Sequence, residues 1–225
     1  INAGFLYNKN MKPLLIAHRG DSKNFPENSI EAFESAFQKG ADGIEFDVQC
    51  NKNQDLVIVH NYTHDPSLEY PFLEDILKRF SMRGRLEIEI KSIEEECVQR
   101  ISKSIYNINP PNIEITSSEL PVIPTMRKFF PDSKIGLIFN SKLIEDWMPL
   151  DHIHRMLLGY MKLTNANVLH LGYRYCSKQI VDLMHDNGYL IHTHLQNSTV
   201  SEYKKALDLG MDQCSFDDVR LLALI

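Results

Sequence analysis

The sequence predicts an α/β protein with the fold of a small, compact (β/α)8 TIM barrel. Short apolar runs typical of buried strands alternate along the 225 residues with segments whose apolar residues recur at helical spacing, and this alternation is repeated eight times. Charged residues and histidines end several of the apolar runs, and the functional side chains of such barrels lie at the carboxyl ends of the strands. A hydrophobic content of 43% is sufficient for a core of this size.

The first half of the chain contains four predicted pairs of strand and helix. Asn28 or Ser29 is the expected cap of the first helix, Gly40 ends that helix, and Ser92 is the expected cap of the third. Strands are predicted at 14–17, within a hairpin-like unit at 42–61, at 86–91 and at 112–118, and helices at 28–40, 71–80, 92–106 and 126–130.

The second half repeats the pattern. Pro149 interrupts one long helical segment, and Gly188 and Gly210 end the two helices that follow. We expect residues 11–225 to form a single TIM-barrel domain and residues 1–10 to be an irregular N-terminal extension or a non-native remnant. Strands are predicted at 134–139, 167–172, 189–194 and 211–216, and helices at 141–162, 178–187, 200–209 and 218–225.

Composition and charge exclude several classes of partner. The net charge of −6 and the absence of a stripe of Lys and Arg argue against nucleic acid, whereas a small phosphorylated ligand needs only local positive charge. No apolar run approaches ~18 residues and no basic-then-apolar leader is present, so we expect a cytoplasmic protein without stable membrane insertion. Ile1 in place of Met is compatible with a removed upstream segment. The four widely separated cysteines form no C-x-x-C pair and are expected to be buried free thiols.

The hairpin-like unit at 42–61 places two carboxylates on one face. Side chains alternate between faces along a strand, so Glu45 and Asp47 point the same way and Phe46 points the other way. Two neighbouring acids repel each other, and a divalent cation between them would offset this repulsion. The second strand of the unit ends in His60, which brings a basic group near the acids. The alternative is a half-buried strand whose acids are solvated or salt-bridged.

The strand at 86–91 supplies a third acid. Its period-two pattern places Glu87, Glu89 and Lys91 on one face, which would destabilise an ordinary core but suits a barrel mouth that faces a metal and a phosphate. Glu45, Asp47 and Glu89 thus offer three hard oxygen ligands, which are suited to one divalent cation, Ca²⁺ or Mg²⁺, rather than to zinc.

Five short words in this order resemble the glycerophosphodiester phosphodiesterase family. They are His-Arg-Gly at 18–20, Pro-Glu-Asn at 26–28, Gly-Ala-Asp at 40–42, Ile-Glu-Phe-Asp-Val at 44–48 and Ile-Glu-Ile-Lys at 88–91. The spacing is also similar, because Glu45 lies 27 residues after His18 and His60 lies 15 residues after Glu45. The resemblance covers the first 91 residues well and the remainder more loosely.

The resemblance implies a role for each of these side chains. His18 and His60 would be the catalytic acid and base, and Glu45, Asp47 and Glu89 would be the metal ligands. Arg19 and Lys91 would bind the phosphate, Arg19 through its planar fork and Lys91 as a point charge. A similar mechanism in that superfamily begins with attack of the neighbouring glycerol hydroxyl on phosphorus and gives a cyclic phosphate, which water then opens.

The chain departs from the family pattern around the second histidine. Asn61 stands where the family has Asp, and His64 with Asp65 copies the local family word at the wrong distance from Glu45. Spacing favours His60. Only 28 residues separate His60 from Glu89, too few for the small capping segment that the family usually inserts there.

Further departures occur near the carboxyl terminus. His194 takes the place of a family tryptophan, so a pocket wall that contacts substrate would be polar, and the closing Thr-Asp word is reduced to Ser-Phe-Asp at 215–217. His170, His192 and His194 could also be read as a zinc trio, although strand histidines are more often polar residues of the core or mouth.

The leading hypothesis is therefore a metal-dependent phosphodiesterase that hydrolyses glycerophosphodiesters to glycerol 3-phosphate and an alcohol, within lipid and glycerol metabolism. A second hypothesis is a phosphodiesterase acting on lysophospholipids or phosphoinositides, which an exposed apolar rim at the barrel mouth would favour. A third is a catalytically weakened barrel that only binds a phosphorylated ligand, motivated by Asn61 and His194. The alcohol group of the substrate and the oligomeric state are not determined by the sequence.

Overall fold

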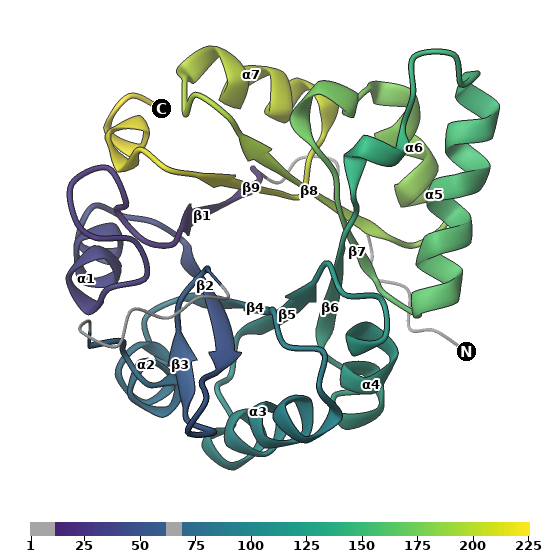
Figure 1. Cartoon of the computed structure of the whole chain (residues 1–225). Coiled ribbons are helices and arrows are strands. Elements are labelled where there is room, and N and C mark those ends of the chain that lie inside the picture. Colours follow the sequence, from purple (N-terminus) through teal and green to yellow (C-terminus); the bar gives the residue numbers. More distant parts are fainter. Residues whose placement is uncertain (1–11, 62–68) are drawn as a thin grey trace.

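Eight parallel strands form a closed ring surrounded by helices in a computed structural model that describes residues 12–61 and 69–225 (Figure 1). The ring closes because the first strand pairs with both the second and the last. The predicted (β/α)8 TIM barrel is confirmed. Its strands are β1 (Leu14–His18), β2 (Gly43–Cys50), β4 (Arg85–Ile90), β5 (Ile113–Ser117), β6 (Lys134–Ile138), β7 (Val168–His170), β8 (Leu190–Leu195) and β9 (Gln213–Phe216).

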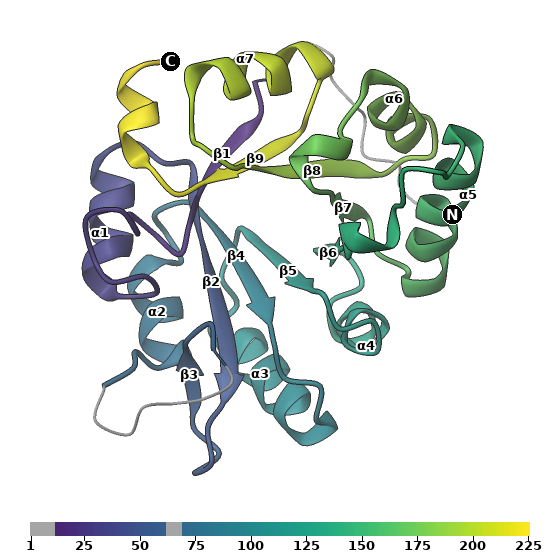
Figure 2. The same cartoon turned by 45° about the horizontal axis from the view of Figure 1, so that its top comes forward.

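A short ninth strand, β3 (Leu56–Ile58), lies outside the ring. It pairs antiparallel with β2, and the Cα atoms of Val48 and Ile58 lie opposite each other. Figure 2 shows β3 beside β2 at the edge of the barrel. The hairpin predicted at 42–61 is thereby confirmed, with its turn at the polar residues 51–55.

The helices follow the predicted order, but the third, fourth and fifth helices begin at other residues than predicted. The hydroxyl of Ser92 accepts a hydrogen bond from the backbone N–H of Cys50, so Ser92 does not cap the third helix. The fourth helix begins before the predicted residue 126, because Pro124 lies in its first turn, where a missing N–H costs nothing. Pro149 caps the fifth. The helices are α1 (Ile30–Gln38), α2 (Leu73–Phe80), α3 (Glu95–Ile108), α4 (Val122–Phe129), α5 (Leu150–Thr164), α6 (Lys178–Asp186) and α7 (Val200–Leu209), with 3-10 turns η1 (Ser141–Leu143), η2 (Tyr173–Tyr175) and η3 (Val219–Ala223).

The apolar core lies between the strands and the helices rather than inside the ring. Phe46 of β2 contacts Phe33 of α1, with ring centroids 5.9 Å apart, and Phe33 in turn contacts Phe80 of α2. Because side chains alternate along a strand, the burial of Phe46 against the helices directs Glu45 and Asp47 into the barrel. The alternation that forms the core thus also positions the acids.

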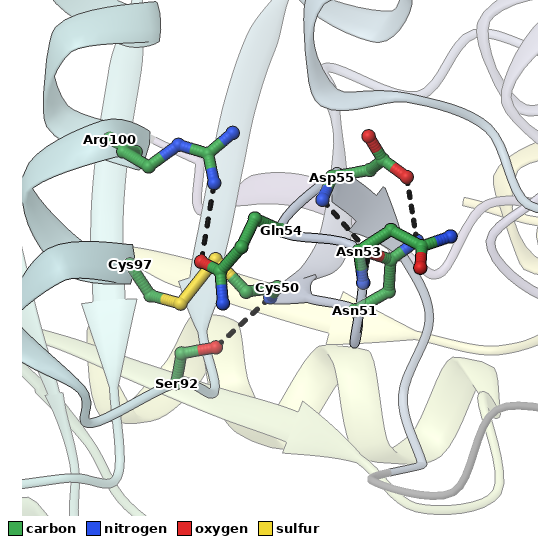
Figure 3. Close-up of a disulfide and its surroundings, with 8 residues drawn as sticks. All are labelled: Cys50, Asn51, Asn53, Gln54, Asp55, Ser92, Cys97 and Arg100. Carbon is green, nitrogen blue, oxygen red and sulfur yellow. Dashed lines mark hydrogen bonds between the residues drawn. A yellow bond between two sulfur atoms is a disulfide. The ribbon is translucent and has the colours of Figure 1, made fainter.

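The expectation of four free thiols is wrong for two of the cysteines. Cys50 at the end of β2 and Cys97 in the first turn of α3 form a disulfide with a Cα–Cα distance of 6.0 Å (Figure 3). The two residues are 47 positions apart, so no local motif marks the pair. Cys176 and Cys214 are buried and free, as predicted. The disulfide ties the carboxyl end of β2 to α3.

Two further expectations concern the limits of the described chain. Residues 1–10, expected to be an extension or remnant, lie outside the described residues. Among the helices within 12–61 and 69–225, none has the length and apolar character required to cross a membrane.

Candidate active site

Three acidic side chains converge at the carboxyl ends of β2 and β4. Glu45 and Asp47 project from β2, and Glu89 projects from β4 at the position opposite Asp47. Each offers an oxygen atom, and these oxygens all lie within 4.8 Å of one another. All three residues are buried. The structure therefore brings together the three carboxylates that the sequence singled out.

The electrostatics of this group suit a divalent cation. Burial, together with the charges of Asp47 and Glu89, raises the pKa of Glu45 well above its ordinary value. Burial also raises the pKa of Glu89 to about 7. Oε1 of Glu45 is buried and has no hydrogen-bond partner among the described residues. These carboxylates outnumber the positive side chains beside them. Their oxygen atoms are the hard ligands that Ca²⁺ and Mg²⁺ prefer, so the three residues fit such an ion.

Two basic side chains lie against the same acids. Nε of Arg19 lies 3.1 Å from Oδ2 of Asp47, and Nζ of Lys91 lies 3.1 Å from Oδ1 of Asp47 and 2.6 Å from Oε1 of Glu89. Burial alone would raise the pKa of Asp47, but Lys91 and Arg19 hold it below its ordinary value. Both residues expected to contact phosphate are thus at the mouth of the acidic site.

The His-Arg-Gly word forms a strained turn that aims the backbone at this site. Arg19 has a φ of 55° and Gly20 a φ of 80°, both in the left-handed region. In this turn the backbone N–H of Arg19 donates to Oε2 of Glu45 at 3.0 Å. A Cβ on Gly20 would come 2.7 Å from the backbone carbon of Ala32, so only glycine fits.

Asn28 is a site residue that the sequence reasoning missed. Its Nδ2 donates to Oδ2 of Asp47 at 2.8 Å, and its Oδ1 accepts from the backbone N–H of Asp47. Of the two expected cap residues, Ser29 caps α1, which leaves Asn28 for the site. The neighbouring Glu27 accepts a hydrogen bond from Nη1 of Arg19 at 3.0 Å. The Pro-Glu-Asn word was the available signal.

His18 is held by an aspartate from the opposite end of the sequence. Nδ1 of His18 lies 2.8 Å from Oδ1 of Asp217, while Nε2 faces Oε2 of Glu45 at 3.9 Å. Burial raises the pKa of Asp217, but hydrogen bonds from His18 and His194 lower it more, well below the ordinary range. The ionised Asp217 accepts the Nδ1 proton, so Nε2 is the free nitrogen and points toward the acids.

His194 lies beside His18 at the mouth. The ring centroids of the two histidines are 4.7 Å apart, and Nε2 of His194 lies 3.6 Å from Oδ2 of Asp217. Nδ1 of His194 contacts the hydroxyl of Ser215 at 3.0 Å. Asp217 therefore joins two imidazoles, a role that the partial Ser-Phe-Asp word did not reveal.

The segment that carries His60 is held by the side chain of Gln49 and by the backbone of β2. Nε2 of Gln49 lies within 2.8–3.1 Å of the carbonyl oxygens of Val59, His60 and Asn61, and the N–H of Val59 donates to the carbonyl of Asp47. Oδ1 of Asn61 lies 3.1 Å from Nδ1 of His60, so Asn61 supplies an acceptor despite replacing Asp. His60 belongs to none of the groups of converging ligand atoms found among the described residues. His64 lies outside the described residues.

A second polar group lies in the barrel interior. Glu87 precedes Glu89 by two residues on β4 and is buried beside Glu114, His170 and His192, so it lies deeper than the mouth position predicted from the sequence. Burial raises the pKa of Glu87 to about 7 and lowers the pKa of His192 to about 4. His170 and His192 stack with ring centroids 4.1 Å apart, whereas His194 lies with His18. The three histidines therefore form no zinc trio.

Comparison with known proteins agrees with this geometry. The model of the glycerophosphoryl diester phosphodiesterase family matches residues 18–69. A glycerophosphodiester phosphodiesterase of Caldanaerobacter subterraneus subsp. tengcongensis is 34% identical over 175 residues, which cover 61% of this chain and 71% of that protein.

Solved structures show the same fold. A glycerophosphodiester phosphodiesterase of Thermotoga maritima superposes with a TM-score of 0.75 at 20% identity, covering 96% of this chain and 99% of the other. A phosphodiesterase of Oleispira antarctica, solved in complex with the product sn-glycerol-3-phosphate, has a TM-score of 0.75 at 17% identity and covers 94% and 96%. These structures share the fold, and the identity and coverage of the Caldanaerobacter relative show that the chain belongs to the glycerophosphodiester phosphodiesterase family of hydrolases.

Proposed function

We propose that this protein hydrolyses glycerophosphodiesters to glycerol 3-phosphate and an alcohol at the mouth of its barrel. The observation that carries the proposal is the convergence of Glu45, Asp47 and Glu89 beside Nε2 of His18. The Oleispira phosphodiesterase, which has the same fold, was solved with sn-glycerol-3-phosphate as its product. Its product is the one expected here.

One divalent cation, Ca²⁺ or Mg²⁺, would be held by Glu45, Asp47 and Glu89. The ion would neutralise charge that develops on the phosphate oxygens. Arg19 and Lys91 already contact Asp47, so a phosphate bound at these acids lies within reach of both cations. Arg19 would hold two phosphate oxygens through its fork, and Lys91 would add a point charge.

His18 and His60 would carry the protons. The free Nε2 of His18 can accept a proton from an attacking hydroxyl or return one to a leaving oxygen, because Asp217 holds the other nitrogen. His60, held by Asn61, would serve the opposite face of the phosphate. In the route that the family resemblance suggests, the neighbouring glycerol hydroxyl attacks phosphorus, the bond to the alcohol breaks, and water opens the cyclic phosphate.

A second candidate substrate is a diester that carries an acyl chain. The segment between β6 and α5 follows the carboxyl end of a barrel strand, so it lies on the catalytic face. It exposes Leu143 and Trp147, of which Trp147 is 68% exposed, and Leu150, the first residue of α5, is also exposed. Apolar side chains in this position favour a lysophospholipid as the alternative substrate.

A barrel that only binds a phosphorylated ligand is the less favoured alternative. Asn61 preserves a hydrogen-bond acceptor for His60, so this departure leaves the histidine oriented. Packing alone does not require four ionisable side chains to converge at one place, so their convergence also argues for catalysis. The four are His18, Glu45, Asp47 and Glu89.

One panel of assays tests these alternatives. The chelated protein is supplied with Ca²⁺ or Mg²⁺ and offered glycerophosphocholine, glycerophosphoethanolamine and lysophosphatidylcholine, and release of glycerol 3-phosphate is followed. We expect turnover that requires the metal and falls about 10²- to 10³-fold or more in Glu45→Gln and His18→Ala, both still folded by circular dichroism. Near wild-type turnover in either variant contradicts the assignment, and metal binding without turnover on any diester supports the binding-only barrel.

A further inference from the structure

The barrel interior contains a second set of potential metal ligands that the proposed reaction does not use. Glu87 of β4, Glu114 of β5, His170 of β7 and His192 of β8 each direct one ligand atom inward, and these atoms all lie within 4.8 Å of one another. Unlike the acids at the mouth, this set combines nitrogen with oxygen. Such a set suits a borderline transition metal such as Zn²⁺ rather than Ca²⁺ or Mg²⁺.

Glu114 acts as an orienting group. Its Oε2 accepts from Nη1 of Arg85 at 3.1 Å and from Nε2 of Gln213 at 2.8 Å, and its Oε1 lies 2.7 Å from Nε2 of His170. The hydrogen bond from Nε2 leaves Nδ1 of His170 as the nitrogen with a lone pair. A carboxylate that fixes the tautomer of a histidine in this way is the usual outer partner of a metal-binding imidazole.

Glu87 and His192 lack such partners. Oε2 of Glu87 and Nδ1 of His192 are buried, and neither has a hydrogen-bond partner among residues 12–61 and 69–225. The two atoms lie 3.3 Å apart, and Oε1 of Glu87 lies 3.7 Å from Nδ1 of His170. A buried carboxylate without a donor is costly, and an ion shared with two imidazole nitrogens would remove that cost.

We propose that Glu87, His170 and His192 form a second ion site, which binds Zn²⁺ with Glu114 as the outer acceptor. The two rings stack with 24° between their planes, and Nδ1 of each ring faces a carboxylate oxygen of Glu87. Gly136 of β6 lets the ring of His170 pack against the backbone, because a Cβ there would come 2.7 Å from Nε2 of His170. Two imidazoles and one carboxylate leave a coordination position open for water.

The site is separate from the acids at the mouth. On β4, Glu87 precedes Glu89 by two residues, so it occupies the inward-facing position nearer the amino end of the strand, where Glu45 is its neighbour in register. Arg85 forms its ion pair with Glu114, the outer acceptor. Zinc binding by these residues therefore does not require phosphodiesterase activity.

Zinc titration of the full chain tests the proposal. The protein is stripped with a chelator, desalted and titrated with Zn²⁺ alone in a calorimeter, in saturating Mg²⁺ that fills the oxygen site. We expect one equivalent of Zn²⁺ to bind, the affinity to fall by about 10- to 100-fold in Glu114→Gln, and by more in Glu87→Gln and His192→Gln.

Two matched variants identify the site. Glu89→Gln alters the acids at the mouth and His194→Gln alters the histidine pair beside Asp217, and both should keep the zinc affinity of the wild type. Zinc binding lost in either of these variants but kept in Glu87→Gln would overturn the proposal, as would the absence of a bound equivalent. Should Glu87→Gln fail to fold, the visible spectrum of the Co²⁺-loaded His194→Gln variant decides, because this variant lacks the histidine pair beside Asp217. Intense bands of a four-coordinate nitrogen-containing site support the proposal, and the weak bands of an octahedral oxygen site refute it.

Discussion

Replacing Asp217 by Asn tests how His18 is held. The substitution keeps the shape of the side chain but removes the charge that accepts the Nδ1 proton of His18 across 2.8 Å. A hydrogen bond to a charged group contributes about 1.5–3 kcal/mol. Because each 1.36 kcal/mol is about tenfold in rate, kcat should fall about 10- to 150-fold. If the Asn amide turns its NH₂ toward Nδ1, the proton moves to Nε2 and the loss approaches about 10⁴-fold.

Steady-state kinetics on a glycerophosphodiester, coupled to oxidation of glycerol 3-phosphate, measures the effect. We expect kcat to fall while KM and metal affinity stay close to wild type, since Asp217 is not in contact with the acids of the metal site. Asp218→Asn is the matched control, because the neighbouring Asp218 pairs with Arg220. An Asp217→Asn enzyme whose kcat stays within about threefold of wild type would show that His18 needs no orienting carboxylate.

Three other predictions concern stability and the second histidine. Asp21→Asn should lower the free energy of unfolding by about 1–3 kcal/mol at neutral pH, because the buried carboxylate accepts hydrogen bonds from a lysine and a serine. Burial raises the pKa of Asp21, but these bonds hold it below its ordinary value, so the deficit should be constant above pH ~5 and shrink as the pH falls below ~4 in urea titrations. Changing Cys50 and Cys97 to Ser should cost about 2–4 kcal/mol and remove the effect of reductant on Tm, and a reductant effect that persists would contradict the disulfide. His60→Ala should lose activity by about 10²-fold or more while His64→Ala keeps it, and the reverse result would transfer the role to His64.

Much of the fold could be predicted because the spacing of apolar residues along the chain indicates which segments are strands and which are helices. Alternation along 42–61 marked the hairpin, and every barrel strand fell on a predicted apolar run. The Cys50–Cys97 disulfide could not be predicted, because its partners meet only when α3 packs beside the end of β2. Spatial neighbours of this kind depend on packing that one sequence does not display.

The site was predictable where it lies within short words. Glu45, Asp47 and Glu89 follow from strand alternation, which fixes the face that a side chain occupies. The depth of Glu87 inside the barrel depends on strand register, so its face was predicted and its layer was not. Asp217 lies 199 residues from His18, and only closure of the ring between β1 and β9 makes them neighbours.

Gln49 gives the barrel mouth a shared mechanical support. Gln49 lies two residues after Asp47 on β2. Its side-chain amide nitrogen lies within hydrogen-bond distance of three successive carbonyl oxygens in the segment that carries His60. Because these contacts tie the segment that carries His60 to the strand that carries Asp47, we expect a shift of β2 to move both residues together.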